Sequence, residues 1–151
     1  MIGKRFFSIL LVFVFAAPFA APQEAGRTFP PQAIIVASYQ GDAEMVRTIL
    51  VSNPDKDARN AFGDTALHVA IFQPNLLVVK LLLDHGFDPN AKTIRNGYTP
   101  LHNAVAANNV GAARLLLQYG ANKNIRALDG LTPLEKARKE EKRDLILLLY
   151  R

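Results

Sequence analysis

The chain has 151 residues, no cysteine and a hydrophobic content of 50%. The lack of cysteine excludes disulfide bonds and thiolate metal sites, and the hydrophobic content is ordinary for a globular protein. The formal net charge of +5 is a modest excess.

The first twenty residues are expected to be a secretory signal peptide. A short basic start precedes an apolar run over residues 6–17. This length fits the apolar region of a signal peptide, about 7–15 residues, and is shorter than the ~17–25 residues of a membrane-spanning helix. We expect cleavage after Ala20, with Ala16 as the alternative site. Residues 21–30 contain two prolines and a glycine and are expected to form a flexible lead-in.

A cleaved signal peptide implies that the mature protein is periplasmic or secreted. It also implies that no stable membrane span remains after cleavage. The alternative is a protein anchored in a membrane by an uncleaved N-terminal segment.

From residue 31 onward the sequence repeats with a nearly fixed period. Three similar hexapeptides, each preceded two residues earlier by a glycine, begin 34 and 33 residues apart at Thr65, Thr99 and Thr132. A period of this size predicts a stack of repeated units. We expect four units, at about residues 31–60, 61–93, 94–126 and 127–151.

The hexapeptides predict the start of a first helix in each unit. Thr132 and Glu135 have the spacing of a capping box, in which the two side chains bond reciprocally across the first helical turn. His68 and His102 take the place of that glutamate in the two preceding units.

A second helix is expected to follow in each unit. Asp42, Asn75 and Asn109 stand at equivalent positions before apolar stretches and are good N-cap residues. Gly86 and Gly120 are expected to end the helix in the left-handed conformation. A polar segment then leads to the next glycine turn, so each unit is predicted to be helix, turn, helix and a hairpin-like finger.

These motifs resemble those of ankyrin repeats. The resemblance rests on the Thr-Pro-Leu-His-x-Ala core of residues 99–104, the Leu-Leu-Leu run of residues 115–117 and the Gly-Ala-x-x-Asn ending of residues 120–124. It covers about residues 31–151 and implies an all-α ankyrin-repeat solenoid of about four helix-turn-helix units. With the signal peptide, the chain resembles small exported ankyrin-repeat proteins of bacteria.

Several positions depart from the repeat pattern. Ala66 stands where the two later units have proline. Pro74 stands in the turn of the second unit, where it must end the first helix or bend the turn. Arg138 replaces an apolar residue in the last unit, as a polar outer face requires. Leu147 occupies a position that is basic in the other units. It either leaves an apolar patch or is buried by rotation of the last helix, and we favour burial.

Catalytic and metal-binding roles are not expected. His68 and His102 could be read as metal ligands or a catalytic pair, but stacked helices lie ~8–10 Å apart, whereas zinc-bound nitrogens lie ~2.0–2.1 Å from one ion. We therefore interpret both histidines as structural. The sequence has no nucleophile motif and no phosphate-binding loop, so we expect no enzyme activity, no cofactor and no metal.

Nucleic-acid binding is also not expected. Basic residues occur near the fingers, at Arg59, Lys92, Arg95, Lys123 and Arg126. A basic stripe would indicate nucleic acid, but aspartates are interspersed among them. We interpret these residues as solvated surface.

The concave face is the predicted binding surface. It comprises the finger tips and the exposed side of the first helix of each unit, which similar repeat proteins use to bind partners. The residues predicted to contact a protein partner are Phe62, Asp64, Phe72, Gln73, Arg95, Asn96, Tyr98, Leu128, Asp129 and Lys139. We expect a non-enzymatic protein-binding module. The alternatives are an exported factor that acts on another cell's proteins, and an accessory protein or inhibitor of an exported enzyme.

Overall fold

The computed structural model describes residues 28–151. The expected signal peptide and most of the expected lead-in lie outside these residues. The described part contains eight helices and no strand, with bounds α1 Ala33–Gln40, α2 Ala43–Val51, α3 Ala66–Ala70, α4 Leu76–Asp84, α5 Pro100–Ala106, α6 Val110–Gln118, α7 Pro133–Lys139 and α8 Arg143–Tyr150. Phe29, within the expected lead-in, is half-buried against the core.

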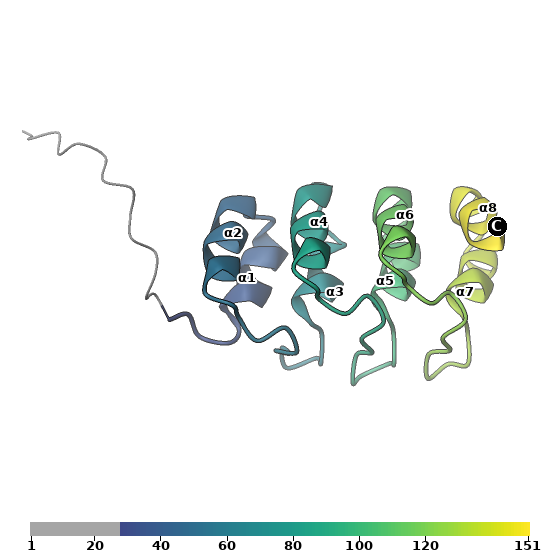
Figure 1. The fold of residues 1–151 in the computed structure, drawn as a ribbon. Coiled ribbons are helices and arrows are strands. Elements are labelled where there is room, and N and C mark those ends of the chain that lie inside the picture. The colour runs from purple at the N-terminus through teal and green to yellow at the C-terminus, as the bar shows by residue number, and fades with distance from the viewer. Residues whose placement is uncertain (1–27) are drawn as a thin grey trace, which may run out of the picture.

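The helices form four pairs that stack side by side, as the repeat predicted (Figure 1). One layer holds α1, α3, α5 and α7, and the other holds α2, α4, α6 and α8. The loops between pairs project together from one side of the stack. Apolar side chains from all eight helices form one continuous core.

The predicted N-cap residues of the second helices are confirmed. Asp42 Oδ1 accepts the Met45 N–H at 3.0 Å, and Asn109 Oδ1 accepts the Ala112 N–H at 2.9 Å. Asn75 caps α4 in the same way. Each cap satisfies a helix-start donor that has no partner within its helix.

The two buried histidines join neighbouring units. His68 Nδ1 accepts the Thr65 N–H at 3.3 Å, and its Nε2 lies 3.0 Å from the carbonyl oxygen of Tyr98 in the next unit. The ring is therefore neutral, with the proton on Nε2, because Nδ1 must accept and Nε2 must donate. His102 repeats this arrangement and bonds the carbonyl of Leu131. The structural interpretation of both histidines is consistent with this geometry.

Pro74 shortens the first helix of its unit, as predicted. The equivalent turns contain Gly41, Asn108 and Glu141, all with positive φ. Proline is fixed near a φ of −65° and cannot adopt that conformation. As a result α3 ends at Ala70, two residues earlier in the repeat than α5.

Each finger is closed by a backbone hydrogen bond between its first and last residues, and a second backbone bond runs from its glycine N–H to the carbonyl of its first residue. We name them the first finger (residues 60–64), the second finger (93–98) and the third finger (127–131). The closing bonds join the first and last residue of each finger at 2.9–3.0 Å. The second finger has one extra residue, which accounts for the step of 34 rather than 33 residues between hexapeptides. The glycine in each finger has positive φ.

The expected burial of Leu147 is wrong. Its side chain is 66% exposed, whereas Leu145 and Leu149 on the same helix are buried. Leu147 lines a shallow hollow of about 300 Å³ between α6 and α8. Helix α8 keeps the same rotation as the second helices of the other units, because its two buried leucines anchor it to the core.

Candidate functional site

The finger tips and the first helices carry large exposed apolar side chains. Phe62 on the first finger is 57% exposed, and Phe72, just after α3, is 55% exposed. Leu128 on the third finger is also exposed. Exposed aromatic side chains gathered on one face are typical of interaction surfaces.

A groove of about 210 Å³ lies between the first and second fingers and the helices α3 and α5. We name it the central groove. It is lined by Asp64, Phe72, Thr93, Arg95, Asn96, Tyr98, Asn103 and Ala106. Half of the predicted partner-binding residues therefore meet in one place. Three separate segments of the chain contribute them, and the repeat brings these segments together.

Arg95 lies at the rim of the central groove, over an aromatic ring. Its guanidinium carbon is 5.4 Å from the centre of the Phe62 ring. This cation–π contact links the first and second fingers and contributes about 0.5–1 kcal/mol at an exposed site. It also favours a position of the guanidinium beside the groove.

Tyr98, which also lines the groove, is a cross-link between units. Its hydroxyl donates to Asp129 Oδ2 at 3.3 Å and accepts from Lys136 Nζ at 3.2 Å. Its ring stacks on His102, with the ring centres 5.3 Å apart. Tyr98 and Asp129 therefore help to fix the third finger, in addition to lining the face.

Lys136 was not predicted as part of this region. Its Nζ lies 4.9 Å from the centre of the Tyr98 ring and 2.5 Å from Glu140 Oε1. Burial alone would lower the pKa of Lys136, but the hydrogen bonds to Glu140 and Tyr98 outweigh it and hold the pKa above its ordinary value. The sequence did contain one indication of this role: Lys136 occupies the repeat position that Val69 occupies in the second unit.

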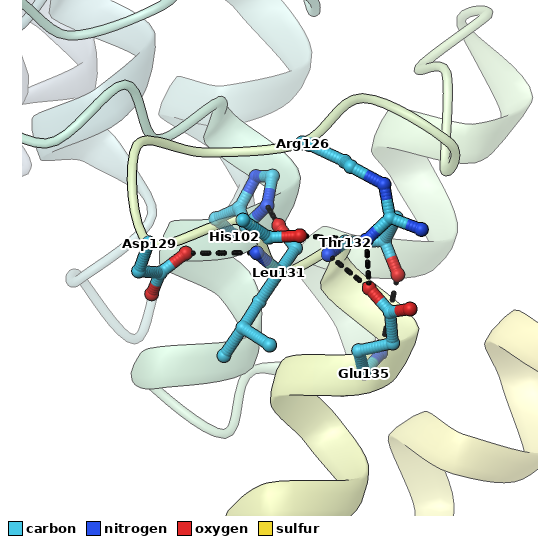
Figure 2. A network of polar contacts seen from close by, with 7 residues as sticks. His102, Arg126, Asp129, Leu131, Thr132 and Glu135 are labelled. Carbon is cyan, nitrogen blue, oxygen red and sulfur yellow. Dashed lines mark hydrogen bonds and ion pairs between the residues drawn. The ribbon is translucent and has the colours of Figure 1, made fainter.

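The third finger is held from both sides (Figure 2). On one side, His102 of α5 bonds the carbonyl of Leu131. On the other, Glu135 Oε2 accepts from Arg126 at 2.7 Å and from the Thr132 N–H at 2.8 Å. The carboxyl pKa of Glu135 lies below its ordinary value because of the Thr132 backbone bond first and the Arg126 bond second.

The remaining predicted residues lie outside the central groove. The Gln73 amide donates to the Tyr39 carbonyl, and Gln73 lines a neighbouring hollow of about 370 Å³. Leu128 lies over Gly97 of the second finger. Lys139 is exposed at the end of α7. These residues extend the surface but do not form one site with the groove.

Basic residues at one repeat position form a ladder along the base of the fingers. Arg59 donates to the carbonyls of Gly63 at 2.8 Å and of Lys92 at 2.7 Å. Lys92 in turn donates to the carbonyl of Arg126 at 3.0 Å. Arg126 then bonds Gly130 in its own finger. Each cation satisfies backbone carbonyls that would otherwise have no partner within the turn.

Lys123 also bonds the backbone: its Nζ donates to the carbonyl oxygen of Leu149 at 3.1 Å. Four of the five basic residues noted near the fingers are thus bonded to the protein's own backbone. Arg95 is the exception: within residues 28–151 no hydrogen bond or ion pair engages its guanidinium. The ladder accounts structurally for charge that would otherwise suggest a nucleic-acid surface.

The burial of His68 and His102 predicts that the folded protein becomes less stable in mildly acidic solution. Burial lowers the pKa of His68 and of His102 below the ordinary value. As the pH falls through about 6.5, the unfolded chain takes up protons that the folded chain still excludes. The contribution of the two neutral histidines to stability is therefore complete above this pH. It decreases as the pH falls further, until the pH reaches their lower pKa in the folded state. We expect the melting temperature, followed by circular dichroism, to fall between pH 7.5 and 5.5.

The control for this prediction is the double variant His68→Gln and His102→Gln. Its melting temperature should change less over the same pH range. The carboxylates of Asp129 and Glu135, whose pKa lies below the ordinary value, lose their contribution only at more acidic pH. An equal fall in the wild type and the double variant would show that other groups cause the effect.

The described residues show no cluster of three or more histidine, cysteine or acidic side chains able to hold a metal ion. Likewise, none of the helices in residues 28–151 is long and apolar enough to cross a membrane. The central groove contains Asp64 but no nucleophile beside a base. Its chemistry suits recognition of another molecule through apolar contact and charge.

Comparison with known families agrees with the repeat pattern. The family model described as "Ankyrin repeats (3 copies)" matches residues 33–127 and again residues 92–151. Together the two matches cover most of the chain and all eight helices of the described part.

Curated relatives share only a part of their length with this chain. Potassium channel AKT1 of Arabidopsis thaliana is 34% identical over 64 residues, and Potassium channel AKT3 of Oryza sativa subsp. japonica is 39% identical over 66 residues. These stretches are 42% and 43% of this chain, and 7% of each channel. The likeness is therefore to a small segment of each channel.

Proposed function

The chain belongs to the ankyrin-repeat family, and we propose that it binds a protein partner through its concave face without catalysing a reaction. Ankyrin repeats generally mediate protein–protein interaction and are typically not enzymes. The exposure of Phe62 and Phe72 beside the central groove is the observation that carries the proposal. Aromatic and arginine side chains are the types most enriched among residues that dominate binding energy.

A rigid surface suits this role. The fingers are fixed by the histidine bonds, the basic ladder and the Tyr98 cross-link. A surface that is already ordered loses little conformational entropy when a partner binds. Partner binding would therefore require no rearrangement of the stack.

Affinity capture tests the proposal. The full-length chain with a C-terminal tag is incubated with envelope and secreted fractions, beside the variant Phe62→Ala, Phe72→Ala and Arg95→Ala. We expect a protein that the wild type retains and the variant loses, because the variant removes the exposed side chains around the groove. Tyr98 is left unchanged, since its loss would also weaken the packing between units.

A matched triple variant controls for the number and kind of substitutions. Leu77→Ala, Arg114→Ala and Leu147→Ala remove two exposed apolar residues and one basic residue from the second-helix layer. This variant should retain the partner. If all three proteins capture the same set, or none captures anything, the concave face is not the binding surface.

We further propose that the protein works after export, in the periplasm or outside the cell, like small exported ankyrin-repeat proteins of bacteria. The support is the layout of residues 1–20. Mass spectrometry of the chain recovered from the envelope should give a mature N-terminus at Ala21. An intact N-terminus would favour the membrane-anchored alternative.

Two other roles would use the same face. An exported factor acting on another cell's proteins would be found in the medium with a target from that cell. An accessory protein or inhibitor would co-purify with an active exported enzyme. The identity of the captured protein separates these possibilities.

A further inference from the structure

Within residues 28–151, Arg95 differs from the other basic residues near the fingers because its N–H donors have no hydrogen-bond partner. Arg59, Lys92, Lys123 and Arg126 each donate to a backbone carbonyl of the protein. Within the described residues, the guanidinium of Arg95 has no hydrogen-bond or ion-pair partner and lies over the Phe62 ring. Five N–H donors are therefore available at the rim of a groove.

The position of Arg95 favours a carboxylate as its ligand. A planar guanidinium can lie over an aromatic ring and still form two parallel hydrogen bonds to a carboxylate. A phosphate group is usually bound by several arginines together. Here the neighbouring cations are already bonded to the backbone, which leaves a single arginine.

The rest of the central groove favours a ligand in which an apolar side chain lies next to that carboxylate. Phe72 and Ala106 are exposed on its helical side. The groove volume of about 210 Å³ is well above the roughly 10–15 Å³ that a cavity needs to hold one water molecule. An apolar side chain placed there would cover the Phe72 ring while its acidic neighbour reaches the rim.

We propose that the central groove recognises an extended protein segment in which an aspartate or glutamate bonds Arg95 and an adjacent apolar side chain packs on Phe72. This inference rests on the proposed function and specifies the chemistry of the partner. Asp64 also lines the groove and disfavours a second acidic residue beside it.

Selection from a random peptide library displayed on phage tests the proposal with a defined probe. The immobilised full-length protein should enrich peptides that contain an acidic residue next to an apolar one. A synthetic peptide with the enriched sequence is then titrated by fluorescence anisotropy. We expect Arg95→Glu to weaken its binding at least about fivefold, because the substitution replaces an attraction with a repulsion.

Three further variants sharpen the measurement. Arg95→Gln removes the charge without reversing it and should weaken binding less than Arg95→Glu. Arg114→Glu makes the same change of charge on α6, away from the groove, and should leave the affinity unchanged. Phe72→Ala should weaken binding of the same peptide. Circular dichroism confirms that each variant is folded.

The proposal is overturned if the library gives no enrichment above the bare support, or if the enriched peptides lack a carboxylate. It is also overturned if Arg95→Glu binds the peptide as tightly as the wild type. Enrichment of basic sequences would assign the groove to another ligand. Capture of a protein by the concave face together with a failed selection would leave the proposed function standing and refute only the acidic–apolar segment.

Discussion

Replacing Gly63 with alanine is expected to destabilise the domain by about 2–5 kcal/mol. Gly63 has a φ of +81°, and a Cβ built there would lie 2.6 Å from the backbone nitrogen of Ile94 in the second finger. The left-handed conformation costs a non-glycine residue about 1–2 kcal/mol, and overpacking adds about 1–3 kcal/mol. The contact is with backbone, so the second finger must shift as a whole. Urea unfolding followed by circular dichroism measures the effect.

Gly130→Ala is the matched control. Gly130 has nearly the same φ, +80°, but a Cβ there would meet nothing within 4 Å. It should lose only the conformational contribution, about 1–2 kcal/mol. Gly97, whose Cβ would lie 3.0 Å from Leu128 Cγ, should give an intermediate result on substitution by alanine and a larger loss with valine. Equal losses at Gly63 and Gly130 would show that the fingers do not pack on one another as described.

The finger glycines show which features of the fold could be predicted from the sequence and which could not. Their spacing predicted the turns, and Gly63, Gly97 and Gly130 all have positive φ in the structure. The difference between them was not predictable, because it depends on which residue of the next finger lies above each glycine. That contact joins residues about 31 positions apart, and no local rule specifies it.

The helix boundaries were largely predictable for a physical reason. Capping by threonine, aspartate and asparagine acts within three residues, so sequence alone carries the information. The effect of Pro74 was also local, since it follows from a fixed φ and a missing N–H. The exposure of Leu147 could not be predicted from the neighbouring sequence. Its exposure depends on how Leu145 and Leu149 anchor α8 to the core.

The candidate site was predicted in part. Family resemblance indicated the face, and the repeat brought Phe72, Arg95 and Tyr98 to one groove. The role of Tyr98 as a cross-link was missed because its partner Lys136 lies 38 residues away. The basic ladder could have been found, since its members recur at steps of 33 and 34 residues. Their nearly equal spacing indicates one shared backbone contact.

Replacing Leu82 with alanine is expected to cost about 2–5 kcal/mol, the range for a fully buried leucine. Leu82 is 0% exposed and lies on α4, which packs between α2 and α6. The loss in melting temperature should be about 10 °C for a domain of this size. Thermal unfolding followed by circular dichroism measures it, and Leu77→Ala on the same helix is the control. Leu77 is 37% exposed, so its truncation should cost about 1 kcal/mol or less.

The shape of the Leu82→Ala transition carries further information. In a stack of repeats, stability is approximately the sum of the units and of the interfaces between neighbours. A cavity in the second unit weakens its contacts with α2 on one side and α6 on the other. The first unit should then unfold before the last two, and the single transition of the wild type should broaden or divide. A sharp transition at an unchanged temperature would contradict the burial of Leu82, because a cavity at the centre of the core cannot be without cost.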